Sequence, residues 1–160
     1  MPRERSLLER LDALAAFVPV LESPDFTFGA WAGGERSADG VITMPWYDLS
    51  DAAADFIGRG AAGWVTPDFD WPDWARSGEF TRLWDDPAGI ASAPPELLGR
   101  LLTVFVRSER FGDGNLLAAF DRGVLTAIAR RAAVLAAELR GGAPGGPADD
   151  PYHGGRDAGR

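Results

Sequence analysis

The sequence predicts a mainly α-helical protein with a small irregular or two-stranded β element near residues 26–47. Apolar residues recur at helical spacing through most of the chain, and helix-capping residues stand where several of these runs begin. Within residues 26–47 the pattern changes to short alternation broken by glycine and proline. We expect a single domain of about five helices over residues 1–140. A disordered tail is expected over residues 141–160, which Gly, Pro and Asp dominate.

The first helix is predicted over residues 7–21. Ser6 and Glu9 form a capping box at its start, and Pro19 closes the apolar pattern. Residues 26–47 then have the character of a short hairpin, with a loop of small and polar residues in the middle. Because a two-stranded hairpin is marginal on its own, we expect it to lie on the helices.

Two more helices are predicted in the middle of the chain. Ser50 is expected to cap one that ends near residues 60–63. The other begins at residues 70–71, because Pro72 fits the first turn of a helix, and it ends before Pro87.

The strongest helical pattern follows two prolines at residues 94–95, and Ser92 is expected to cap it. Its apolar face carries Leu98, Leu101, Leu102 and Phe105. Its opposite face carries Thr103, Arg107 and Arg110. Glu109 points toward the apolar face, so either the helix frays there or this carboxylate pairs with an arginine.

A glycine-containing break over residues 111–115 precedes the last helical pattern, and Asp113 is expected to cap the helix that follows. The apolar stripe from Leu117 to Leu135 keeps its phase across Gly123. This helix therefore either runs through Gly123 or breaks there.

Two sequence blocks resemble an uncharacterised bacterial family, a domain of unknown function. The C-terminal block reads T-x3-R-x2-RF-x2-G, from Thr103 to Gly114, and a helix with Gly123 follows it. The earlier block is FDW-x2-W over residues 69–74, preceded by Phe26 and Gly29. The resemblance covers roughly residues 7–139. It implies a shared fold and folding unit, and it implies no activity, cofactor or catalytic residue.

Composition excludes several classes of function. The chain has no cysteine and no lysine, which removes disulfides, thiolate chemistry and Schiff-base lysines. Its only histidine is His153, so we predict no metal site, no cofactor and no histidine-based triad. The formal net charge of −8 argues against nonspecific binding to nucleic acid or anionic lipid and is compatible with a basic protein partner. No apolar run approaches 18 residues, so we expect a cytoplasmic protein with no membrane span.

The candidate ligand-binding residues are Arg107, Arg110, Trp71, Trp74 and Thr103. The two arginines lie three residues apart and can reach one target, such as a phosphate or carboxylate held beside the amides of residues 112–114. Asp113 argues against this anion, because its carboxylate would repel it. We favour the interpretation that the arginines pair with carboxylates of the chain, among them Asp70, Asp73 and Asp113.

Two other patterns have structural explanations that we favour. The carboxylates at residues 68, 70 and 73 are spaced D-x-D-x-x-D, but Pro72 interrupts a calcium-loop pattern, so we expect them to act as caps and turn residues. The six tryptophans are more often core residues than a ligand-stacking patch in a domain with short helices.

The sequence does not state a function. We favour a non-catalytic binding or interaction module of the bacterial cytoplasm. The alternative is a small-molecule or nucleotide-binding protein, or an enzyme, that uses Arg107, Arg110 and the Trp71/Trp74 region. Ion-paired arginines would favour the first hypothesis, and unpaired guanidinium groups in an open pocket would favour the second.

Overall fold

The computed structural model describes residues 3–142. This part of the chain contains eight α-helices: α1 (Leu7–Ala15), α2 (Val18–Leu21), α3 (Asp51–Asp55), α4 (Trp71–Trp74), α5 (Gly78–Asp85), α6 (Pro95–Ser108), α7 (Asn115–Asp121) and α8 (Val124–Gly141). It also contains β1 (Gly29–Ala32), β2 (Trp46–Leu49), the π-helical η1 (Phe56–Ala61), and the 3-10 turns η2 (Ala62–Trp64) and η3 (Pro87–Ser92). The mainly helical class with a two-stranded β element is confirmed. The expected tail lies almost entirely outside the described residues.

The prediction of about five helices was too low, because three predicted helices are each divided, the last of them at Gly123 between α7 and α8. The helix expected over residues 7–21 ends at Ala15, since Pro19 has no N–H to donate to the carbonyl of that residue, and α2 begins at Val18. The helix expected from residue 71 to residue 86 stops after Trp74. Ser77 then starts α5 as its N-cap, because its hydroxyl accepts the Phe80 N–H at 3.2 Å.

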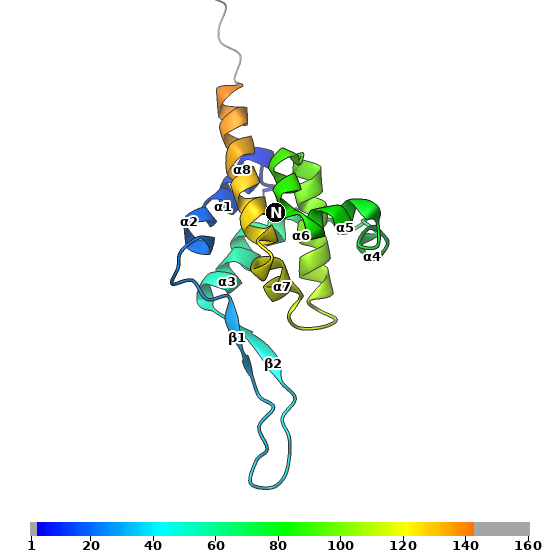
Figure 1. Ribbon diagram of the computed structural model, residues 1–160. Coiled ribbons are helices and arrows are strands. Elements are labelled where there is room, and N and C mark those ends of the chain that lie inside the picture. The colour runs from blue at the N-terminus through cyan, green and yellow to red at the C-terminus, as the bar shows by residue number, and fades with distance from the viewer. Residues whose placement is uncertain (1–2, 143–160) are drawn as a thin grey trace, which may run out of the picture.

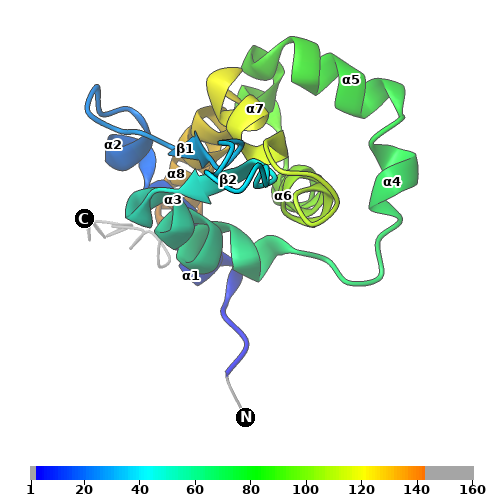
Figure 2. The same cartoon turned by 90° about the horizontal axis from the view of Figure 1, so that it is seen from below.

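The core lies where α1, α6 and α8 meet. Leu11 and Leu14 of α1 are completely buried, as are Val124, Leu125 and Ile128 of α8. Ion pairs join Asp12 of α1 to Arg140 of α8, and Glu22, which follows α2, to Arg130 of α8. Figure 2 shows α4 and α5 as an outer corner beside α6. Within residues 3–142, no helix combines the length and the apolar character needed to cross a membrane.

The α6 helix follows its predicted phase and is enclosed more fully than predicted. Leu98, Leu101, Leu102 and Phe105 are all at most 3% exposed, so the apolar face is confirmed. Thr103 is also fully buried, because η2 and the chain after it cover the face that was expected to be polar. The predicted N-cap is wrong: Pro94 occupies that position, and the Ser92 hydroxyl donates to the Gly89 carbonyl inside η3.

The β element projects from the helices instead of lying on them. β1 and β2 pair antiparallel, from Gly29 opposite Leu49 to Ala32 opposite Trp46. The pairing continues outward, since the Gly34 N–H donates to the Thr43 carbonyl at 2.8 Å. We call residues 29–49 the arm. Figure 1 shows it extending well beyond the helical body, contrary to the expectation that a hairpin would rest on helices.

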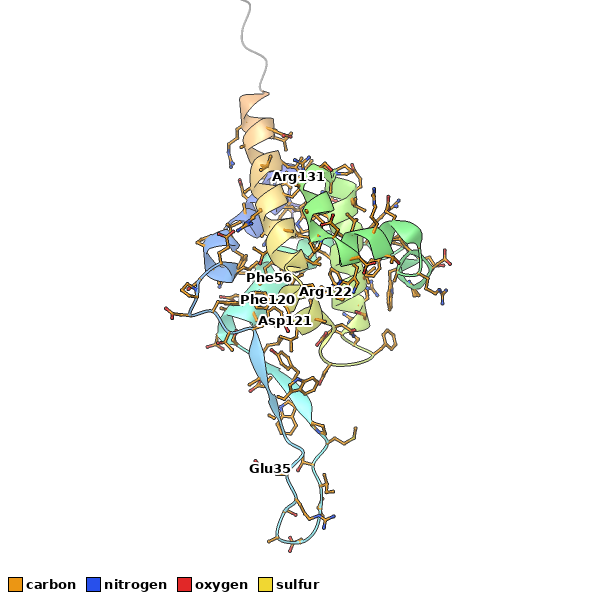
Figure 3. The ribbon with its side chains drawn as sticks, viewed as in Figure 1. Glu35, Phe56, Phe120, Asp121, Arg122 and Arg131 are labelled. Carbon is orange, nitrogen blue, oxygen red and sulfur yellow. The ribbon has the colours of Figure 1, made fainter. Side chains whose placement is uncertain are left out.

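The root of the arm explains how an isolated two-stranded hairpin is stabilised. Phe28, immediately before β1, is 2% exposed and stacks on Phe120 of α7 at 5.3 Å between ring centroids. The Phe26 ring meets the same Phe120 ring edge-on at 5.1 Å. Tyr47 of β2 stacks on Phe28 at 6.4 Å. The helical body therefore buries the aromatic base of the arm and leaves the rest in solvent, where Glu35 marks its outer part in Figure 3.

Candidate functional site

The structure separates the predicted ligand-binding residues into buried and exposed groups. Trp74 is 9% exposed, and its indole N–H donates to Glu79 Oε1 at 3.0 Å. The Thr103 hydroxyl donates to the Gly99 carbonyl at 2.7 Å and accepts the Thr66 N–H at 3.0 Å. Both side chains thus hold the interior together. Trp71 is half-buried, and its ring lies 6.1 Å from the exposed ring of Phe111.

Arg107 and Arg110 lie near the end of α6 without the predicted carboxylate partners. Arg110 is exposed, and Arg107 is half-buried with its Nε shielded from solvent and without a hydrogen-bond partner. Neither guanidinium forms an ion pair with another residue of the described region.

The predicted pairing was wrong because each candidate carboxylate has another role. Asp70 caps α4 by accepting the Asp73 N–H at 3.1 Å, as its predicted role at a helix start requires. The Asp73 carboxylate pairs with Arg76 instead, with 3.8 Å between Asp73 Oδ1 and Arg76 Nη2. Asp113 Oδ2 accepts the Tyr47 N–H at 3.1 Å.

The α6 helix ends at Ser108, as the first alternative for Glu109 expected, and the Glu109 carboxylate has a role that neither alternative foresaw. Its two carboxylate oxygens accept the N–H of Gly114 at 2.9 Å and the N–H of Leu116 at 2.8 Å. It therefore caps α7, the role expected of Asp113, from the end of the preceding helix. Gly114 makes this return of the chain possible, because its φ of 103° lies in the left-handed region. Gly123 uses the same conformational freedom. Its φ of 79° separates α7 from α8, so the helical pattern breaks at this residue and does not run through it.

The chain between α6 and α7 also fixes the direction of the arm. Asp113 binds the outer edge of β2 through the Tyr47 N–H, and the Trp31 ring lies against Gly114, where an added Cβ would be 3.3 Å from Trp31 Cζ2. Trp31 and Tyr47 meet edge-on at 5.3 Å. Burial raises the pKa of the Tyr47 hydroxyl, and the nearby carboxylates of Asp121 and Glu109 raise it further.

The arm carries a set of large apolar side chains in solvent. These side chains are Trp31, Val41, Ile42, Met44 and Trp46. We call these five side chains, together with the exposed ring of Phe111, the arm surface. Trp31 is 55% exposed, Trp46 46% and Phe111 84%. At about 150–250 Å² per aromatic side chain, these three rings alone leave roughly 300–450 Å² in water. Successive residues of a strand point to opposite faces, so Trp31 and Trp46 expose their rings on opposite sides of the hairpin.

Two cavities lie elsewhere on the helical body. One of about 240 Å³ is lined by Trp71 and other aromatic residues, with Ser108 and Asn115 as polar neighbours. The other, of about 490 Å³, lies between α1 and the first turn of α6. In the second cavity Arg10 and Arg100 stack on aromatic rings, but two carboxylates also line it, so its charge does not select an anion.

Sequence reasoning missed the arm surface, because its tryptophans were assigned mainly to the core. The β-branched and apolar residues 41–44 were a signal of a strand, but strand character does not state which face of the strand is covered. It also missed Glu109 and Asp113 as the residues that connect the two helices to the arm. The long glycine-rich stretch before Val41 was the only signal that the hairpin reaches away from the body.

Comparison with known proteins places the chain in a family without assigning a role. The model of a family of unknown function, DUF6508, matches residues 6–138. The matched region includes the arm, the loop between α6 and α7, and nearly all of α8. No curated protein and no solved structure matches the chain.

Proposed function

We propose that this chain, which belongs to the DUF6508 family of unknown function, is a non-catalytic protein-binding module of the bacterial cytoplasm. The observation that carries this proposal is the arm surface. Six large apolar side chains stand in water on a projecting hairpin and the loop beside it, whereas the helical body buries its own large apolar residues well. A protein partner would remove this apolar surface from water.

The geometry at the root of the arm supports recognition of a partner. The Phe28–Phe120 stack and the Asp113–Tyr47 hydrogen bond hold the base of the hairpin before any partner arrives. A pre-positioned binding element loses less conformational freedom on binding than a loop that must first become ordered. The strands present aromatic rings, which supply a large contact area for few rotatable bonds.

A photocrosslinking experiment tests this proposal. A photoreactive amino acid is placed at Met44, on the arm, and in a second protein at Val134, which is an apolar residue of α8 that is 48% exposed. The full chain is then irradiated in the cells that produce it. We expect a discrete protein adduct from position 44, weakened by Trp46→Ser, and a lower yield from position 134. Equal yields at the two positions, or no adduct at position 44, would overturn the proposal.

A second candidate function is supported by the unpaired arginines. Arg107 and Arg110 have no carboxylate partner within the described chain, and Trp71 and Phe111 stand near the same end of α6. This arrangement is compatible with an anionic small molecule or nucleotide. If it binds one, phosphate or ATP raises the melting temperature of the parent chain and not that of Arg107→Gln. If neither anion changes the melting temperature of the parent, this candidate is refuted.

A further inference from the structure

We propose that the arm binds a second copy of this chain, through antiparallel pairing of the outer edges of the two β1 strands about Trp31. The proposal rests on the proposed function, because it names the partner for the same arm. Its product is a symmetric dimer with a continuous four-stranded sheet.

The outer edge of β1 is open. β1 pairs with β2 alone among the described strands. The Ser50 N–H donates to the Phe28 carbonyl at 3.0 Å, which sets the alternation along the ladder. In antiparallel strands this alternation turns the backbone groups of Phe28 and Ala30 toward β2 and those of Gly29 and Trp31 away from it. Figure 1 shows the outer side of β1 clear of helices along the arm.

The two edges of the hairpin differ in how they are protected. On β2, Asp113 occupies the outward N–H of Tyr47, and Pro45 has no N–H to offer. Residues 29–33, in contrast, contain no charged residue and no proline. Natural edge strands usually carry such residues, because an unprotected edge pairs with another strand. The edge of β1 therefore has the composition of a strand that is meant to be paired.

The sequence of this edge is self-complementary. Residues 29–33 read Gly-Ala-Trp-Ala-Gly, a palindrome with Trp31 at its centre. Antiparallel pairing about a twofold axis at Trp31 places Gly29 opposite Gly33 of the other copy and Ala30 opposite Ala32. The two Trp31 residues face each other, and the outward N–H and C=O groups of each bind the other. The small residues on both sides leave room for the two indole rings, each 55% exposed in the single chain.

The same register gives the tip of each arm a place on the other copy. Beyond Ala32, where β1 ends and Gly33 and Gly34 adopt φ angles of 78°, the antiparallel direction carries the outer arm of one copy toward residues 25–26 of the other. Arg36, the only basic residue of the arm, then approaches Asp25 of the other copy, and neither residue has an ion-pair partner in the described part of a single chain.

Charge and area set the conditions for this dimer. Each copy carries a formal net charge of −8, so the two bodies repel each other at low ionic strength. The paired edges are uncharged, and salt screens the longer-range repulsion, so association should strengthen as salt is added. A stable interface buries roughly 800 Å² per partner, so the pairing of two short strands has to be supplemented by contacts of the arm tips.

The oligomeric state of the full chain tests the inference directly. Mass is measured by light scattering or sedimentation from about 1 to about 100 µM chain, at low and at high salt. We expect a monomer–dimer equilibrium that shifts toward dimer at high salt. Trp31→Lys should weaken dimerisation by more than about 30-fold, because it places two like charges at the twofold axis. Val134→Lys, which adds the same charge at an exposed position of α8 away from the arm, should leave the dimer nearly unchanged.

A disulfide experiment reports the register without depending on the fold of the lysine variant. The chain has no cysteine, so Trp31→Cys provides the only thiol. Directly opposed residues lie about 5.5 Å apart between Cα atoms, within the range of a disulfide. We expect oxidised dimer from Trp31→Cys and little from Val134→Cys, although the two positions are similarly exposed in the single chain, at 55% and 48%.

The outcomes separate this inference from the proposed function. A parent chain that stays monomeric at about 100 µM in high salt overturns the dimer. So does a dimer that Trp31→Lys and Val134→Lys weaken equally. If the chain is monomeric while position 44 still crosslinks to a different protein, the proposed function stands and only the second copy is wrong. If position 44 crosslinks to nothing, both proposals fail.

Discussion

Removal of the Glu109 carboxylate should destabilise the domain more than any exposed glutamate substitution. Glu109 accepts two backbone N–H groups, from Gly114 and Leu116, at a half-buried site. A hydrogen bond to a charged group is worth about 1.5–3 kcal/mol, and partial exposure to water places this pair near the low end of that range. We therefore expect Glu109→Ala to lower the free energy of unfolding by about 2–3 kcal/mol, which corresponds to a fall in melting temperature of roughly 5–10 °C.

Two further variants make the Glu109 prediction specific. Glu109→Gln keeps one acceptor oxygen and loses the charge, so it should show about half the loss of the alanine variant. Glu35→Gln, on the exposed outer arm, should be nearly neutral. Urea denaturation followed by circular dichroism measures all three. A loss below about 0.5 kcal/mol for Glu109→Ala would refute the idea that this carboxylate closes the junction between α6 and α7.

Three other predictions follow from the fold and the caps. Phe105→Ala should lower the free energy of unfolding by roughly 3–5 kcal/mol, because Phe105 is 3% exposed and contacts Phe80 and Trp84; a loss under about 1 kcal/mol in a urea melt would contradict this packing. Gly123→Ala should cost about 1–2 kcal/mol through its φ of 79°, since no neighbouring atom blocks the added methyl group, whereas Gly78→Ala should be close to neutral in the same thermal melts. Hydrogen bonds from the Ser6 backbone hold the pKa of Glu9 below its ordinary 4.5, so the stabilisation from this cap is present above that value and disappears as the pH falls through the lowered pKa. Ser6→Ala removes the hydroxyl but keeps the backbone N–H that lowers this pKa most, so the pKa of Glu9 should move only part of the way back toward 4.5 in an NMR titration, and an unchanged value would contradict the role of the hydroxyl in the cap.

Elements defined by local pattern were predictable from the sequence. The capping box at Ser6, the Ser50 cap and the apolar face of α6 depend on residues within one or two turns of each other, and the structure confirms all three. The β element was also predicted, although its strands lie a few residues later than expected. A hairpin can be recognised from alternation, but its direction depends on Phe120, which is distant in the sequence.

The candidate site could not be predicted to the same extent, because its contacts depend on how distant segments meet. Arg107 and Arg110 share one helix face, but backbone N–H groups and Arg76 had already engaged the three carboxylates that were expected to bind them. Glu109 lies on the apolar side as expected, and its partners became available only because the chain turns back at Gly114. Tryptophan count alone does not separate the buried Trp64 from the exposed Trp31.

The contact between α1 and α8 has a consequence for how the protein is made. The Asp12–Arg140 ion pair spans a sequence separation of 128 residues, and the buried leucines of α1 pack against the last helix of the domain. At a synthesis rate of about 5–20 residues per second, α1 leaves the ribosome roughly 6–25 s before its partner does. The nascent chain therefore completes its fold only after translation of α8, and until then the leucines of α1 lack the helix that covers them.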